Sequence, residues 1–167
     1  MKAVFKCDIE DKWPEFYDYT VEELTYAIRR AVNTAAYMLK TQTQSNFNST
    51  GIRNDRNPKY IDTLSDAIRM RKSRVTNMGE DIFSEVSILG SRETGSGTFR
   101  LRFFEKGTND RYQNSINGHP LKKPRYVGRI KPSWFFKNAN VAIESQIDSI
   151  YNDQITKAIE KINSTNI

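Results

Sequence analysis

The chain has 167 residues, of which 37% are apolar, 28% charged and 11% aromatic, and its net charge is +6. This length is typical of a single domain, and the aromatic content excludes a disordered chain. No apolar run approaches the roughly 20 residues of a membrane span, and charges occupy the place of a signal peptide's apolar core, so we expect one soluble domain over 1–167 that does not enter a membrane.

The first predicted elements are an edge strand and a long helix. Residues 1–13 alternate weakly between apolar and polar side chains, as a half-buried strand does. From Thr20 the pattern becomes helical, because Thr20 and Glu23 form a capping box and apolar residues then recur every three or four positions. We expect a helix over about 20–46 whose alanines let it lie close against a sheet. The apolar residues that would share one face of the strand are Ala3, Phe5, Cys7 and Ile9.

The middle of the chain predicts a small antiparallel sheet. Residues 46–62 are polar and should form a loop, followed by one short helical turn over 64–68. Strands are expected at 69–76, 82–89 and 98–104, because apolar residues alternate with polar ones in the last two. Glycines between these strands predict turns that pair neighbours as antiparallel hairpins.

A basic segment follows the predicted sheet. Glycines and prolines recur throughout 105–132, which predicts a long loop without extended regular structure. No aspartate or glutamate occurs from 111 to 141, so the segment is a candidate surface for assembly or for DNA. A solvated, mobile loop is the alternative. The candidate residues are Arg111, Lys122, Lys123, Arg125, Arg129 and Lys131.

The last predicted element is a helix from 133 to about 163, opened by Trp134, Phe135 and Phe136. We interpret this aromatic triplet as a core anchor, with a stacking platform for single-stranded nucleic acid as the alternative. The order strand, helix, three strands, helix predicts an α+β domain. In it, two long helices cover a small antiparallel sheet of three to four strands, and the long basic loop precedes the C-terminal helix. The core domain should span 20–163.

Residues that could carry catalysis or bind a metal are scarce. Cys7 and His119 are the only cysteine and histidine, and they lie far apart in the sequence, so they predict neither a zinc site nor a nucleophile with its base. A lone cysteine forms no internal disulfide, which fits a reducing compartment. Glu80 and Asp81 lie in a turn-like polar stretch, and the glycines of 95–97 lack the lysine of a phosphate-binding loop. We therefore expect no catalytic residue, metal, cofactor or small-molecule substrate.

Two short motifs flank the basic segment. At the end of the third predicted strand, the chain has a phenylalanine, a glutamate, any residue, a glycine and a threonine. After the basic segment come a proline, aromatic residues and an alanine at the start of a helix. The residues of the two motifs are Phe104, Glu105, Gly107, Thr108, Pro132, Trp134, Phe135, Phe136 and Ala139. This pattern resembles the tail-completion and neck proteins, which join head and tail, of long-tailed bacteriophages of the lambda gpZ type.

The resemblance extends over most of the chain, from about 20 to 160. The long first helix and the short turn over 64–68 both have counterparts in the family. Two departures stand out. The family's threonine-glycine pair occurs earlier here, at Thr50 and Gly51, which makes the following loop longer. Residues 1–19 have no counterpart and are a candidate docking arm.

What the resemblance implies is a virion structural protein without enzymatic activity. It would form a ring of its own copies, contact portal or head-completion proteins and tail proteins, and touch genomic DNA non-specifically in the lumen. It would be found in the neck or tail of the virion, and in the host cytoplasm during assembly. The alternative is a small basic nucleic-acid-binding phage accessory protein, and a small nuclease is a third, weaker interpretation.

Overall fold

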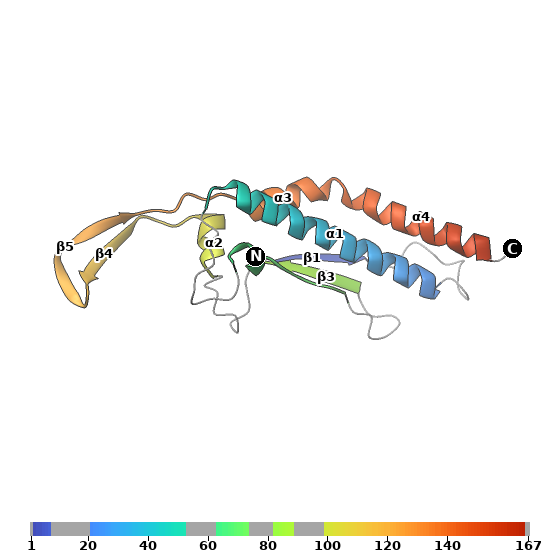
Figure 1. The fold of residues 1–167 in the computed structure, drawn as a ribbon, viewed down its shortest axis with the longest axis horizontal. Helices are drawn as coiled ribbons and strands as arrows, with labels where there is room; N and C mark the ends of the chain where they lie inside the picture. The colour runs from blue at the N-terminus through green and yellow to red at the C-terminus, as the bar shows by residue number, and fades with distance from the viewer. Residues whose placement is uncertain (1, 8–20, 53–62, 74–81, 89–98, 166–167) are drawn as a thin grey trace.

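The protein is described from a computed structural model, which covers residues 2–7, 21–52, 63–73, 82–88 and 99–165. Helices and a small antiparallel sheet share one core, and a second pair of strands extends away from it (Figure 1). The α+β class predicted from the sequence is confirmed. In chain order the elements are β1 (Lys2–Cys7), α1 (Val21–Ser49), the 3₁₀ turn η1 (Ser65–Ala67), β2 (Arg69–Arg71), β3 (Ile82–Ser87), α2 (Phe99–Lys106), β4 (Arg111–Ile116), β5 (His119–Gly128), α3 (Phe135–Glu144) and α4 (Ile147–Thr165).

The central sheet has the order β1-β3-β2, and both pairings are antiparallel. Burial alternates along β3, where Ile82 and Val86 are buried while Phe83 is exposed. In β1, Ala3 is paired with Val86 and Cys7 with Ile82, so both stand opposite residues of the buried face. The strands predicted at the amino terminus and near 69–76 and 82–89 are therefore confirmed, although β2 already ends at Arg71 and β3 at Ser87. Ile9 lies outside the described residues.

Helix α1 lies between the sheet and the C-terminal helices (Figure 1). Ala31, Ala35 and Ala36 have no exposed surface, and their small side chains allow close packing on both sides of the helix. The helix ends three residues later than the sequence predicted, at Ser49, where the Thr50 N–H and hydroxyl both donate to the Phe47 carbonyl. The predicted cap residue Thr20 lies outside the described part of the chain.

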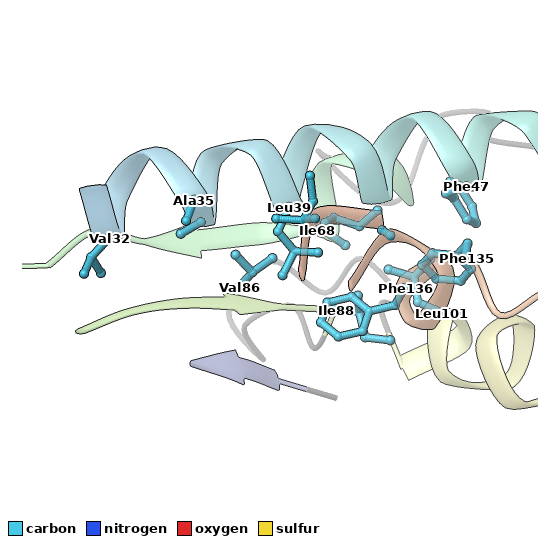
Figure 2. Packing of buried hydrophobic residues seen from close by; sticks show 14 of the residues in the cluster. Val32, Ala35, Leu39, Phe47, Ile68, Val86, Ile88, Leu101, Phe135 and Phe136 are labelled. Atoms are coloured by element: carbon cyan, nitrogen blue, oxygen red, sulfur yellow. The ribbon is translucent and has the colours of Figure 1, made fainter. Parts of the chain in front are cut away.

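The core joins side chains from all three layers, as Figure 2 shows. Phe47 of α1 meets Phe135 of α3 edge to face, with ring centroids 5.2 Å apart. Phe135 and Phe136 are buried, which confirms their prediction as core anchors. Trp134 is 39% exposed, so including it in the anchor was wrong.

The strand predicted at 98–104 is wrong, because residues 99–106 form helix α2. Leu101 and Glu105, one helical turn apart, are both fully buried, whereas Phe103 is 44% exposed. The apolar alternation therefore does not describe which side chains face the core. Gly107 follows the last residue of α2 with φ +72°, the left-handed conformation that commonly ends a helix.

The prediction that 105–132 form a long loop without extended regular structure is also wrong, because this segment contains the β4–β5 hairpin. Ile116 pairs with His119, which leaves Asn117 and Gly118 as a two-residue turn. Both turn residues have positive φ, +50° and +81°, as the mirror-image turns that suit twisted hairpins require. Asn-Gly is the commonest sequence of such turns, so the signal was present in the sequence.

The predicted C-terminal helix is interrupted. The break lies between α3 and α4, where the Gln146 N–H donates to the Ile143 carbonyl. Predicted turns near residues 79, 90 and 95–97, and the carboxylates Glu80 and Asp81, lie outside the described residues. Within the described ranges, none of the helices has the length and apolar character needed to cross a membrane.

Candidate assembly interface

The β4–β5 hairpin extends from the body at the end opposite the carboxyl terminus (Figure 1). The candidate basic residues are all exposed, with four in its strands and two just after β5. The four within the strands are Arg111, Lys122, Lys123 and Arg125, and the two beyond them are Arg129 and Lys131. The hairpin and the segment just after it therefore present every predicted basic residue to solvent, and the exposed position that the sequence predicted for this segment is confirmed.

A tyrosine pair stabilises the hairpin from within. Tyr112 and Tyr126 are cross-strand neighbours with ring centroids 5.5 Å apart, although both are more than half exposed. The Tyr126 hydroxyl donates to Asp110 Oδ1 at 3.2 Å. The pKa of Tyr126 is raised from its usual value of 10.0 by partial removal from water and by the Asp110 carboxylate. A cross-strand aromatic pair contributes about 0.2–1 kcal/mol, so the hairpin has only modest stability of its own.

The base of the hairpin is held by Thr108 and Ile130. The Thr108 N–H donates to the Ile130 carbonyl at 2.9 Å, and the Ile130 N–H donates to Thr108 Oγ1 at 3.0 Å. A Cβ on Gly107 would lie 2.8 Å from the Ile130 oxygen and 2.9 Å from Pro132 Cδ. The two chain segments approach each other so closely here that only glycine fits.

The buried side chain of Glu105 also holds together the two chain segments at the base of the hairpin, the junction between hairpin and body. Its carboxylate is fully buried and accepts hydrogen bonds from the backbone N–H groups of Phe136 (2.9 Å) and Lys137 (3.0 Å). These N–H groups belong to the first turn of α3, which has no intrahelical acceptor for them. Trp134, the residue before the helix, offers no capping side chain and has φ +52°. Glu105 of α2 thus caps α3 in place of a local residue, and the helix dipole favours its negative charge there.

Backbone contacts complete the junction. The Ser133 N–H and hydroxyl both donate to the Phe104 carbonyl, at 2.9 and 2.7 Å, and the Trp134 N–H donates to the Glu105 carbonyl at 3.2 Å. Ala139 is fully buried in the core cluster one turn further along α3. Lys137 Nζ lies 5.4 Å from the centre of the Trp134 ring, so the exposed indole packs beneath a cation.

The two sequence motifs therefore form one structural unit. The Glu105 carboxylate of the first motif binds the N–H groups of Phe136 and Lys137, which follow the second motif's proline at the start of α3. Four of the motif residues precede the hairpin in the chain and five follow it. The four are Phe104, Glu105, Gly107 and Thr108, and the five are Pro132, Trp134, Phe135, Phe136 and Ala139. Their contacts fix the hairpin to the body at its two ends.

Cys7 and His119, the residues considered for catalysis or metal binding, lie in different parts of the fold. Cys7 ends β1 in the central sheet, whereas His119 opens β5 in the hairpin. Among the residues that the structure describes, no three histidine, cysteine, aspartate or glutamate side chains gather as a metal site would need. Comparisons with protein-family models, with curated proteins and with solved structures find no match to the chain.

Proposed function

We propose that the protein is a structural subunit at the head–tail junction of a tailed bacteriophage. It acts in tail completion or head–tail connection, as part of an oligomeric ring, and its role is assembly rather than catalysis. The observation that carries the proposal is the union of the two motifs at the base of a projecting hairpin. The resemblance rests on these motifs, and their contacts give them one shared structural purpose.

The hairpin itself supports a role in contact with other molecules. A two-stranded hairpin is marginally stable in water, and here nearly all of its side chains are exposed. Nevertheless, the buried Glu105 and the closely packed Gly107 hold the hairpin at a defined place on the body. Such an arm is useful when it must meet a neighbour in a fixed orientation.

Ring assembly requires two different patches on each subunit, because each copy contacts the next in a head-to-tail manner. The basic hairpin and the helical body offer such a pair. Neighbouring portal or head-completion proteins and tail proteins would contact the faces of the ring, and genomic DNA would pass through its lumen. The protein would act in the host cytoplasm during assembly and remain in the neck or tail of the virion.

A second candidate function, a small basic nucleic-acid-binding phage accessory protein, is favoured by the exposed cations of the hairpin. The oligomeric state in the absence of DNA separates the two. A dedicated binder weakens steeply as salt rises and stays monomeric, whereas a neck subunit self-associates into a ring of uniform size without DNA.

The experiment is light scattering on the purified protein, with electron microscopy of the same sample. We expect a closed ring of one mass, seen also in negative stain. A monomer at all concentrations up to about 100 μM, a range in which weak specific interfaces begin to form, would argue against the proposal. Localising the protein by labelled antibody to the neck of purified virions would then support it directly.

A further inference from the structure

An open hollow of about 400 Å³ lies at the base of the hairpin and is lined by both of its chain segments. One wall is the end of α2 with the turn after it, and the other is the segment that leaves β5. Three of the lining residues are cationic, namely Lys106 from the first wall and Arg129 and Lys131 from the second. Lys106 was not among the basic residues that the sequence singled out, because it lies between Glu105 and Asp110, before the stretch without acidic residues begins.

The charge in this hollow is not balanced locally. No carboxylate is among its lining residues. Lys106, Arg129 and Lys131 are all exposed, and within the described part of the chain none of them forms an ion pair. Asp110, whose carboxylate accepts a hydrogen bond from Tyr126, is not among the lining residues. Three cations facing one hollow repel each other, so an anion bound there would relieve this repulsion.

The composition of the lining decides which anion fits. Centres of protein–protein interfaces are rich in aromatic residues and depleted of lysine. This hollow has two lysines and one arginine, and its apolar members are only Ile130 and Pro132. Interfaces with DNA are more polar and much more positive, and arginine and lysine are the usual ligands of phosphate. The lining therefore favours a phosphate over an acidic protein surface.

We infer that this hollow binds the phosphodiester backbone of duplex DNA, without reading the base sequence. Its volume exceeds what one phosphate group fills, so it accommodates a stretch of backbone rather than a single ion. Lys122, Lys123 and Arg125 are also exposed, further along β5. The inference deepens the proposed function, since it names the part of the subunit that contacts the genome inside the ring.

The test is fluorescence anisotropy with a labelled duplex of about 25 base pairs, which exceeds two helical turns, measured from 50 to 200 mM salt. The groove variant carries Lys106→Gln, Arg129→Gln and Lys131→Gln. The control variant carries Arg30→Gln, Lys157→Gln and Lys161→Gln, which removes one arginine and two lysines from exposed positions on the helical body. Melting curves and light scattering on all three proteins verify the fold and the ring.

We expect the groove variant to reduce the slope of log affinity against log salt by about 2–3, since each lost phosphate contact removes about 0.9. Its affinity at about 100 mM salt should fall at least tenfold, while the control variant binds like the wild type. Two duplexes of unrelated sequence should give equal affinities.

Several outcomes would overturn the inference. Equal losses in the groove and control variants would mean that net charge alone attracts DNA. Absence of DNA binding by the wild type at 50 mM salt would exclude the site, and loss of the ring in a folded groove variant would assign the hollow to a protein neighbour. If the groove variant unfolds, the pair Lys106→Glu and Lys131→Glu, which leaves Arg129 in place, is measured in the same assay, and wild-type DNA binding by that pair would refute the inference. The proposed function would fail separately, through the absence of a ring in the wild type.

Discussion

The Glu105 carboxylate caps the helix that contains Lys137, although 32 residues separate the two in the chain. One carboxylate oxygen accepts from the Lys137 N–H and the other from the Phe136 N–H. Helix caps are usually supplied by the residue just before the helix. Here a side chain of α2 takes that place, so α2 and α3 are fastened together at the two ends of the hairpin.

Glu105→Ala should therefore destabilise the whole protein. The substitution leaves two N–H groups buried without an acceptor and removes the volume of the carboxylate, which together cost about 2–4 kcal/mol. Glu105→Gln keeps one acceptor oxygen and should cost about 1–3 kcal/mol. Urea unfolding measures both. A wild-type midpoint for Glu105→Ala would mean that the carboxylate does not hold α3 in place.

Gly107 offers a test of crowding that is separate from backbone strain. Gly107 and Gly51 have nearly the same φ, +72° and +70°, but a Cβ at Gly51 would meet no atom within 4 Å. Gly51→Ala should cost about 1–2 kcal/mol, the cost of the left-handed conformation alone. Gly107→Ala should cost clearly more, and Gly107→Val more still, because the Ile130 carbonyl and the Pro132 ring must move. Thermal melting of the three variants gives the comparison, and equal losses for the two alanine variants would contradict it.

Deletion of the hairpin should leave the body folded. Arg111 pairs with Gly128, so their chain ends are close enough for two glycines to replace residues 111–128. Most of the removed side chains are exposed, and burial is what stabilises a fold. We expect a melting temperature within a few degrees of the wild type together with loss of the ring in light scattering. A large fall in melting temperature would show that the hairpin belongs to the folding core.

Reversal of three hairpin charges tests assembly separately from folding without removing any part of the chain. Lys122→Glu, Lys123→Glu and Arg125→Glu should not change the melting temperature noticeably, because exposed charges contribute about 0–1 kcal/mol each. The same variant should fail to support infectious particles in a complementation assay. The matched reversal at Arg30, Lys157 and Lys161 should still complement. Normal titres from the hairpin variant would mean that its charges have no part in joining head to tail.

Elements whose evidence is local could be predicted from the sequence. The apolar spacing of α1 and the alternation of β3 each arise from neighbours along the chain, and both were predicted close to their observed bounds. The Asn117-Gly118 turn had an equally local signal, which the glycines and prolines around it obscured. The exposure of the basic segment followed from its composition, because a segment with so few apolar side chains cannot form a core.

Only the tertiary structure determined that residues 99–106 form a helix. Their sequence alternates like a strand, which would place Leu101, Phe103 and Glu105 on one face. Leu101 and Glu105, one helical turn apart, are buried, but Phe103 between them is exposed, as in a helix. The role of Glu105 could not be predicted either, because its partners are N–H groups of α3, and backbone groups leave no mark in a sequence. For the same reason Lys106, Arg129 and Lys131 remained separate charges until the crossing of two chain segments brought them around one hollow.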